Sequence, residues 1–297
     1  MATITVIVNG ASRAKAKYYH GILPALKAHH VTTIETRHAG HAWALAVEHA
    51  PNTDFLLAAG GDGTLNEVVN GTLAAAGARP ALGVIPLGSG NDFARTLGLT
   101  AEGPLYADLV QRKSLRPVDV GVIEYRDASG ETKHRHFVNV CSVGMGPDVL
   151  KRMARKPRWL GANTNYFVSI LESFFSFAPL PLYAKADDFQ FTGNVRVLAL
   201  ANGRSFGNRL VIAPQAKTDD GQLEIFLVGE ATAWDFIRLQ GQLKAGNVLQ
   251  HPHVRYASCR EMALTSPTEA GLEADGEWVG FLPARVSVAQ QKLNFIA

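Results

Sequence analysis

The residues whose types and spacing best suit chemistry form a glycine-rich turn, Gly60-Gly61-Asp62-Gly63-Thr64, with Leu65 and Asn66 directly after it. A segment typical of a buried strand, 54–59, precedes the turn, and a segment typical of a helix, 65–76, follows it. Glycines let the backbone turn sharply and let an anion approach the amides, while a helix N-terminus offers oriented N–H donors. The turn is therefore predicted to bind phosphate, with the side chains of Thr64 and Asn66 as further donors.

Asp62 is the acidic residue of this turn. A carboxylate beside phosphate groups is repelled unless a cation lies between them, and Mg²⁺ binds carboxylate and phosphate oxygens together. Asp62 therefore predicts magnesium beside a bound phosphate. The same residues also allow a plain Gly-Asp-Gly turn in which Asp62 caps the following helix.

A second glycine-rich turn follows the next predicted strand. Segment 86–95 reads Pro-Leu-Gly-Ser-Gly-Asn-Asp-Phe-Ala-Arg, and it contains Gly88, Ser89, Asn91 and Asp92. Glycines, a hydroxyl and an aspartate again lie between a strand and a helix. Two adjacent units with this chemistry favour a phosphate site over two unrelated turns. Neither turn has the spacing of a Walker A loop or of the G-x-G-x-x-G dinucleotide loop.

Strands and helices alternate through the first part of the chain. Strands are predicted at residues 4–8, 31–36, 54–59 and 81–85, and helices at 15–29, 41–49, 65–76 and 92–97. This alternation predicts a parallel sheet covered by helices on both faces, with ligands bound at the carboxyl ends of the strands.

Strands predominate after Pro117. They are predicted at residues 118–125, 137–143, 184–191, 195–201, 223–228, 254–257, 261–265 and 284–288, with helical regions near 147–177 and 232–243. Strands joined by short turns predict an antiparallel β-sandwich. We therefore expect two domains, residues 1–118 and 119–297, and an active site between them.

The composition argues against several classes of protein. A net charge of +3 on 297 residues gives no overall reason to expect a nucleic-acid partner. Cys141 and Cys259 lie far apart without metal-ligand spacing, so neither a disulfide framework nor a thiolate metal site is expected, and a reducing cytosol is the simpler location. Neither a signal peptide nor a transmembrane helix is expected, because the most apolar helical stretch, 166–182, is short for a membrane span.

The two turns and two later segments resemble the diacylglycerol kinase catalytic domain family, whose relatives include bacterial lipid kinases, sphingosine kinases and ceramide kinases. The later segments are 213–223, Ala-Pro-Gln-Ala-Lys-Thr-Asp-Asp-Gly-Gln-Leu, and 272–277, Leu-Glu-Ala-Asp-Gly-Glu. The resemblance covers nearly the whole chain. It implies a parallel α/β nucleotide domain similar to that of NAD kinases and phosphofructokinases, followed by an antiparallel β-sandwich domain.

The resemblance also implies that the first domain binds ATP. The matching positions are Asn9, Thr36, Gly60, Gly61, Asp62, Gly63, Thr64, Leu65, Asn66, Gly88, Ser89 and Asn91. Two features depart from the family pattern. Ser89 stands where threonine is usual, and the turn 9–13 reads Asn-Gly-Ala-Ser-Arg where asparagine-proline-x-serine-glycine is usual.

By the same resemblance, the Asp-Gly-Glu motif supplies the general base, as either Glu277 or Asp275. Magnesium would be positioned by Asp62, Asp92 and Asp119. From the residues alone, Asp275 followed by glycine is also typical of a hairpin turn.

The resemblance further implies a second, structural Mg²⁺ held by Asp220 and by the backbone carbonyls of Lys217 and Gln222. The residues alone also suit an Asx turn at Asp220.

A run of basic residues, 151–158, directly precedes Trp159 and an aromatic stretch that extends to Phe177. Cationic residues beside aromatic ones suit an anionic membrane surface. A solvated helix face followed by core aromatics is the alternative interpretation.

Together these features predict an ATP- and Mg²⁺-dependent lipid kinase that acts on a diacylglycerol-like membrane lipid. It would be cytoplasmic and peripheral at the inner face of the membrane, with a homodimer as the expected oligomer. The alternatives are a kinase for a soluble acceptor such as NAD or a sugar, and a degenerate module that binds nucleotide or lipid without catalysis. A dinucleotide oxidoreductase is disfavoured by the glycine spacing.

Overall fold

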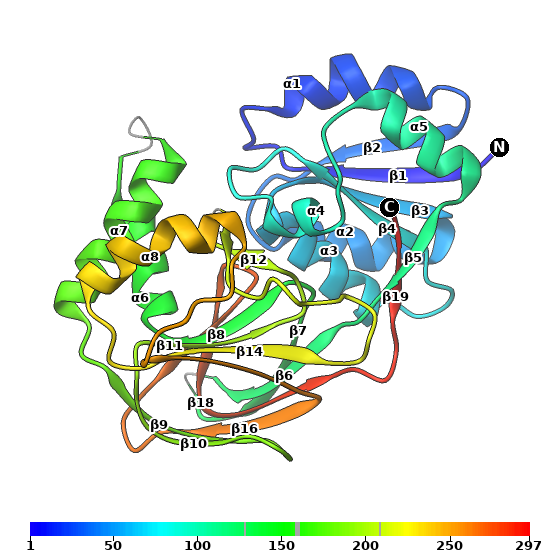
Figure 1. Ribbon diagram of the computed structural model, residues 1–297. Coiled ribbons are helices and arrows are strands. Elements are labelled where there is room, and N and C mark those ends of the chain that lie inside the picture. The colour runs from blue at the N-terminus through cyan, green and yellow to red at the C-terminus, as the bar shows by residue number, and fades with distance from the viewer. Residues whose placement is uncertain (128, 158–160, 208) are drawn as a thin grey trace. The chain divides into compact units, whose positions relative to one another are not determined.

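The computed structural model describes residues 1–127, 129–157, 161–207 and 209–297 (Figure 1). The chain divides into two compact units, Met1–Val118 with Gln291–Ala297, and Asp119–Gln290. The predicted second domain extended to residue 297, whereas the last strand, β19 (Leu293–Ile296), pairs with β4 (Ala81–Pro86) and β5 (Leu115–Val118) of the first unit. The end of the chain therefore completes the sheet of the first unit.

The first unit contains the predicted parallel sheet. Its strand order is β2-β1-β3-β4-β19-β5, in which β1 is Thr3–Val8, β2 is His30–Glu35 and β3 is Phe55–Gly60. The strands β1 to β4 pair in parallel, and β5 is an antiparallel edge strand. Strand β3 is buried along its whole length, as expected for a strand covered on both faces.

The helices of the first unit are α1 (Lys15–Lys17), α2 (His41–His49), α3 (Asp62–Ala74), α4 (Asp92–Thr96) and α5 (Gly103–Arg112). The predicted continuous helix at 15–29 was wrong, since α1 is followed by a short π-helix at Tyr18–Ile22 and a 3₁₀ helix at Leu23–Leu26. Pro24 has no N–H to continue an α-helical ladder there. Helix α5 was missed, although its Gly103-Pro104 start is typical of a helix N-terminus.

The second unit is built on a large antiparallel sheet. Its strand order is β10-β9-β16-β18-β17-β8-β11-β14-β15, with β6 paired to β18 and β7 to β6. The strands are β6 (Gly121–Arg126), β7 (Thr132–Phe137), β8 (Val140–Gly144), β9 (Leu180–Lys185), β10 (Gln190–Val195), β11 (Val197–Ala201), β14 (Leu223–Val228), β15 (Val254–Cys259), β16 (Glu261–Thr265), β17 (Gly271–Ala274) and β18 (Glu277–Val288). A short hairpin, β12 (Ser205–Phe206) with β13 (Leu210–Val211), lies outside this sheet.

Several strand boundaries differ from the sequence-based expectation. The predicted strand 184–191 spans a turn, because β9 ends at Lys185 and β10 begins at Gln190. Strands β7, β17 and β19 were not predicted. Strand β18 is much longer than the predicted 284–288, since it extends from Glu277.

Alternate residues of the central strands enter two different cores. In β11, Leu198 and Leu200 pack in one core, while Val197, Ala199 and Ala201 pack in the other. The first core is enclosed by the strands themselves. The second lies between the sheet and three helices, α6 (Met145–Arg155), α7 (Ala162–Ser176) and α8 (Ala233–Ala245), which Figure 1 shows together beside β11 and β14. The period of two along a strand thus separates a sandwich interior from a helix-covered face.

The helices that the structure describes include none with the length and apolar character needed to cross a bilayer.

Candidate active site

Three loops meet at the carboxyl ends of β1, β2 and β3 in the first unit. The Asn9 side-chain amide donates to Thr64 Oγ1 at 3.2 Å, and the Gly10 N–H donates to Thr36 Oγ1 at 3.2 Å. The Asn9 backbone N–H donates to the Ala59 carbonyl at 2.8 Å. These bonds bring Asn9, Thr36 and Thr64 together, as expected for residues that end neighbouring parallel strands.

The two glycine-rich turns also lie against each other. The Gly60 carbonyl accepts hydrogen bonds from the N–H groups of Leu87, at 2.8 Å, and Gly88, at 3.1 Å. A Cβ added to Gly88 would lie 2.4 Å from Gly61 Cα, a separation that no side chain tolerates. Ser12 Oγ donates to the Leu87 carbonyl at 3.0 Å, so the first loop is tied to the second turn. Glycine at 88 is therefore required for the two turns to approach this closely.

Asp62 lies in the first turn of α3, but its carboxylate caps a different helix. Its oxygens accept the N–H groups of Asp92 and Phe93 at the start of α4, each at 3.3 Å. The alternative in which Asp62 caps the following helix is therefore wrong, because Gly61 is the N-cap of α3 and the Asp62 carboxylate accepts N–H groups of α4 instead. Asp92 is 4% exposed and forms an ion pair with Arg95 at 2.6 Å.

The remaining predicted nucleotide-binding residues fall into two groups. Leu65 and Asn66 are 1% and 0% exposed, so their side chains point into the unit. Ser89 is exposed, and Asn91 adopts a left-handed conformation with φ 55° before α4. The Asn91 side chain receives the Gly88 N–H at 3.0 Å and donates to the Gly88 carbonyl at 2.7 Å. Asn91 therefore shapes the second turn.

In the second unit, Asp119 lies against the segment that contains the other predicted magnesium ligands. The Asp119 N–H donates to the Thr218 carbonyl at 2.6 Å, and Asp119 Oδ2 accepts the Gly221 N–H at 2.7 Å. Asp220 Oδ1 accepts the Gln222 N–H at 3.1 Å, which is the geometry of an Asx turn. The structure therefore brings Asp119 together with the segment from Lys217 to Gln222.

The donors at both predicted metal positions are oxygen atoms. Asp62 and Asp92 lie together in the first unit, and Asp119 and Asp220 belong to the second. Within the described ranges, no group of three or more histidine, cysteine or acidic side chains forms a ready-made metal cluster. Carboxylates, carbonyls and substrate phosphates are the ligands that Mg²⁺ uses, and it usually retains several waters. These residues therefore fit Mg²⁺ in chemical type.

The Asp-Gly-Glu motif forms the turn between β17 and β18. Asp275 and Gly276 have φ values of 50° and 82°, and Ala274 pairs with Glu277 across the hairpin. Two successive residues with positive φ are typical of a type I′ hairpin turn. The hairpin interpretation is thus correct for the backbone, and it places Glu277 at the exposed start of β18.

Asp275 is held by the backbone of the neighbouring loop. Its carboxylate accepts the N–H groups of Val138, Asn139 and Val140 at 2.9–3.0 Å, and the side chain is buried. Asn202, which is fully buried, donates from its side chain to the carbonyls of both Asp119 and Val138. A common polar core therefore supports Asp119 and the hairpin turn.

Glu273 is a buried carboxyl group that the sequence analysis missed. It is 4% exposed, and Ser142 Oγ donates to it at 2.6 Å. Burial raises the pKa of Glu273, the Ser142 hydrogen bond opposes the rise, and the nearby charges of Asp275 and Glu277 add to it, so that the resulting pKa is about 7. A Cβ on Gly146 of α6 would lie 2.7 Å from Glu273 Oε1, so glycine leaves space for this carboxyl group.

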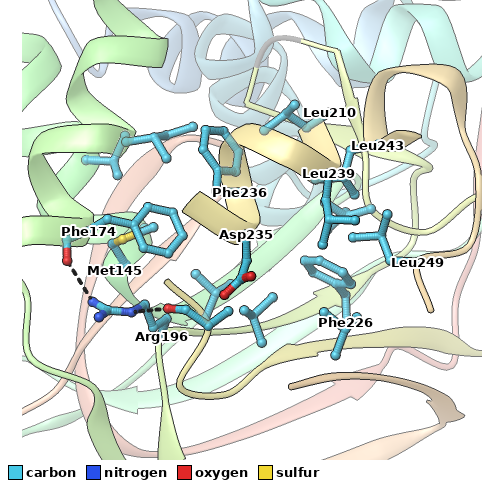
Figure 2. Close-up of a pocket in the computed structure, with 18 of the residues that line it drawn as sticks. Met145, Phe174, Arg196, Leu210, Phe226, Asp235, Phe236, Leu239, Leu243 and Leu249 are labelled. Atoms are coloured by element: carbon cyan, nitrogen blue, oxygen red, sulfur yellow. Dashed lines mark hydrogen bonds between the residues drawn. The ribbon is translucent and has the colours of Figure 1, made fainter. Parts of the chain in front are cut away.

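An apolar cavity of about 90 Å³ lies on the helix-covered face of the second unit (Figure 2). Side chains from α6, α7, α8 and the sheet line it, among them Met145, Phe174, Arg196, Leu210, Phe226, Asp235, Phe236, Leu239, Leu243 and Leu249. Arg196 donates to the carbonyls of Phe174 and Phe177 at the end of α7 and to that of Ala231. The guanidinium group of Arg196 is thereby satisfied, and the aromatic and aliphatic part of the lining can accept an apolar ligand.

The predicted basic segment is partly occupied by ion pairs. Arg152 pairs with Asp148 at 2.7 Å, and Lys156 pairs with Glu172 of α7 at 2.7 Å. Lys151 lies 4.7 Å from the centre of a Trp278 ring. Arg158 and Trp159 lie outside the described residues. The described part of this segment therefore serves at least in part to fasten α6 to α7.

Comparison with known proteins gives the family. Residues 3–123 match the diacylglycerol kinase catalytic domain, and residues 140–297 match the YegS C-terminal NAD kinase beta sandwich-like domain. A diacylglycerol kinase of Bacillus subtilis is 31% identical over 254 residues, which are 85% of this chain and 80% of that protein. The chain belongs to the diacylglycerol kinase catalytic domain family.

A diacylglycerol kinase of Staphylococcus saprophyticus is 30% identical to this family member, over 82% of this chain and 76% of that protein. The family assignment makes the chain an enzyme, a lipid kinase of the diacylglycerol kinase type.

Solved structures agree with the fold of this lipid kinase. A diacylglycerol kinase structure from Bacillus anthracis superposes with a TM-score of 0.73 at 22% identity, over 99% of this chain and 96% of that one. An NAD kinase from Archaeoglobus fulgidus in complex with ATP gives a TM-score of 0.56 at 12% identity, over 99% and 93%. The expected NAD-kinase-like first domain and antiparallel second domain are confirmed at the level of fold.

The buried carboxyl group of this lipid kinase should leave a pH signature in its stability. Glu273 has a pKa of about 7 in the folded chain and an ordinary value of 4.5. Between those values the folded chain retains a proton that the unfolded chain has released, so the stabilisation present below the lower value is lost as pH rises to the upper one. We expect Glu273→Gln to remove this loss, which amounts to about 3 kcal/mol in the free energy of unfolding.

Urea unfolding of wild type and Glu273→Gln at pH 5 and pH 8 measures the effect. Glu131→Gln, at an exposed position of the same unit, is the matched control and should retain the wild-type difference. Identical pH dependence in wild type and Glu273→Gln would contradict the assignment.

Proposed function

We propose that this lipid kinase transfers the γ-phosphate of ATP to a hydroxyl group of a diacylglycerol-like membrane lipid, with Mg²⁺. The observation that carries the proposal is the apolar cavity of the second unit, in a chain whose first unit holds two glycine-rich turns at the mouth of a parallel sheet. A phosphate-binding edge is needed for any nucleotide kinase. A kinase whose acceptor is a lipid also needs an apolar site for the hydrocarbon chain.

Phosphate binding is assigned to the backbone of the two turns. The paired turns present glycine amides and the N-terminus of α3 at the carboxyl ends of β3 and β4. Thr64 and Thr36 are already hydrogen-bonded to the Asn9 loop, so their side chains hold the turns in place. The amides therefore face the nucleotide without further rearrangement of the loops, and positioning of this kind is central to phosphoryl transfer.

Magnesium would be held through Asp62 and Asp92 in the first unit and through Asp119 and Asp220 in the second. When bound, Mg²⁺ neutralises charge that develops on the phosphate oxygens. Asp62 keeps its carboxylate beside the second turn, because the N–H groups of Asp92 and Phe93 orient it. Arg95 compensates the charge of Asp92.

Glu277 is proposed as the general base that takes the proton of the lipid hydroxyl. The carboxylate of Asp275 is occupied by three backbone N–H groups, so Asp275 is assigned a positioning role. Glu277 lies two residues further on, at the exposed start of β18. The type I′ turn fixes the direction in which Glu277 leaves the hairpin, and a base needs that fixed direction to reach a hydroxyl proton.

The acceptor is assigned by class from the cavity and from the relatives. The cavity wall between α7 and α8 is aromatic and aliphatic, and Phe174 stacks on Phe236 with ring centres 5.5 Å apart. Such a lining favours a hydrocarbon chain over a sugar or a dinucleotide. The relatives named above are diacylglycerol kinases, which points to the same class.

A phosphorylation screen tests the proposed reaction. The protein is incubated with γ-labelled ATP and Mg²⁺ together with total bacterial lipid extract, purified diacylglycerol, or NAD, and products are identified by mass spectrometry. We expect labelled lipid, and none with Asp62→Ala. Labelled NAD without labelled lipid would replace the lipid acceptor with a soluble one, and ATP-independent labelling would remove the nucleotide assignment.

Replacement of the proposed base should abolish the chemical step. We expect Glu277→Gln to lower kcat by about 10²- to 10⁴-fold, because a general base contributes that much, while the Kd for ATP remains unchanged. Initial rates and equilibrium nucleotide binding measure the two quantities. Glu131→Gln, another exposed glutamate of the same unit, should keep the wild-type kcat. A Glu277→Gln enzyme with wild-type kcat would exclude Glu277 as base.

Separation of the two turns should weaken nucleotide binding. The Cβ of Gly88→Ala would lie 2.4 Å from Gly61 Cα and 2.9 Å from Asn91 Oδ1, so the turns must move apart. We expect the Kd for ATP to rise at least about tenfold, since overpacking of this kind is worth about 1–3 kcal/mol.

Isothermal titration with ATP and Mg²⁺, accompanied by a thermal-unfolding scan, distinguishes lost binding from lost folding. Gly21→Ala is the matched control, because nothing lies within 4 Å of its added Cβ, and its Kd should be unchanged. Wild-type affinity in a folded Gly88→Ala variant would contradict the assignment of the turns to phosphate.

A further inference from the structure

Helix α8 has two chemically different sides. Phe236, Leu239 and Leu243 line the apolar cavity (Figure 2). On the other side of the helix, Trp234 is 72% exposed and Ile237 is 37% exposed. Arg238 and Gly241 are also exposed, and their spacing places them on this same outer side. A single exposed apolar side chain is ordinary, but tryptophan at this exposure, one helical turn from an exposed isoleucine, forms an apolar stripe on the outside of the helix.

The charges of α8 are distributed unevenly between its two sides. Asp235 is its acidic residue, and it belongs to the inner side, where it completes a capping box with Thr232 and lies 3.5 Å from His251. Arg238 and Lys244 are exposed, and neither forms an ion pair with a carboxylate among the residues that the structure describes. The outer side of α8 therefore combines tryptophan, isoleucine and two cations.

The neighbouring helix α7 also has one buried and one exposed aromatic side chain. Phe174 is buried and stacks on Phe236 of α8, whereas Phe175, the next residue, is 81% exposed. Phe167 of α7 also contacts Phe236, with ring centres 6.0 Å apart. Thus α7 and α8 both line the cavity and both present a large apolar side chain to solvent.

We propose that the outer side of α8, with Trp234, Ile237, Arg238 and Lys244, docks on an anionic lipid bilayer. Charge complementarity identifies this partner, since a cationic helix with aromatic anchors is the pattern of interfacial membrane helices. The inference rests on the proposed lipid acceptor and adds the element that contacts the membrane. It assigns this role to α8 in place of the predicted basic segment 151–158, in which Arg152 and Lys156 form ion pairs.

Docking through α8 would bring the wall of the cavity to the bilayer surface. The same helix would then touch the membrane with Trp234 and the bound lipid chain with Phe236, Leu239 and Leu243. A lipid could enter the cavity at the edge of this helix without passing through bulk water, where exposure of its hydrocarbon chain is unfavourable.

Vesicle flotation in the absence of nucleotide and diacylglycerol tests the docking by itself. The probes are vesicles of phosphatidylcholine alone and of phosphatidylcholine with phosphatidylglycerol. We expect Trp234→Gln/Ile237→Gln to weaken binding to the anionic vesicles by at least about fivefold. We expect Arg238→Glu/Lys244→Glu to weaken it by at least about tenfold and to leave the weaker binding to neutral vesicles unchanged.

Two variants in the first unit serve as matched controls. Trp43→Gln removes a tryptophan that is 42% exposed, and Lys27→Glu reverses an exposed cation. Both should bind vesicles as the wild type does. Equal vesicle binding by wild type and both α8 variants would overturn the proposal. A change of oligomeric state in the α8 variants, without any wild-type binding to vesicles, would overturn it in favour of a second copy as the partner.

Activity measurements separate this proposal from the proposed function. With diacylglycerol dispersed in detergent, the α8 variants should phosphorylate at the wild-type rate, whereas with diacylglycerol in anionic vesicles their rate should fall in parallel with binding. Equal losses in both assays would overturn a docking role. If no lipid is phosphorylated in either assay, the acceptor assignment fails, while the flotation result still decides the docking.

Discussion

The constraint on which the first unit depends is the contact between two glycine turns. Gly60 uses one carbonyl for two N–H groups of the next turn, and Gly61 and Gly88 approach so closely that a Cβ at position 88 would lie 2.4 Å from Gly61 Cα. Asp62 adds a carboxylate that orients the start of α4. Backbone groups, and not long flexible side chains, therefore define the phosphate-binding edge. Such groups are already ordered before a ligand arrives, which favours binding.

In the second unit, the alternation of side chains along the central strands determines where the apolar cavity and the buried acidic residues lie. Alternation along β8, β11 and β14 sends one set of side chains into a sandwich interior and the other toward three helices. Because the helices cover the sheet with large side chains, an apolar cavity remains between them. The carboxyl groups of Glu273 and Asp275 lie on the helix-covered side of β17 and its turn, since they alternate with Leu272 and Ala274 of the interior. The period of the strand thus places two acidic side chains and the apolar cavity on the same side of the sheet.

Much of this arrangement could be predicted from the sequence, and the omissions have physical causes. Glycine turns between a strand and a helix have local signatures, so Gly60 to Thr64 and Gly88 to Asp92 were found. Glu273 and Asn202 were missed, because their importance comes from burial among residues distant in the sequence. The cavity was missed for the same reason, since its lining comes from segments that extend from Met145 to Val254. The return of β19 to the first sheet likewise depends on pairing with residues more than 170 positions earlier.

The motif Asp275-Gly276-Glu277 shows why structure is needed to divide roles within a pattern. In sequence the two carboxylates look equivalent, and either suits a base. In the structure the hairpin turn separates them, because Asp275 adopts positive φ and turns its carboxylate to the backbone of Val138 to Val140. Three N–H donors satisfy an acid that burial would otherwise destabilise, and they also fix the turn. Glu277 lies at the exposed start of a long strand. The hydrogen bonds of the Asp275 carboxylate fix the turn, and the turn sets the direction in which Glu277 leaves it.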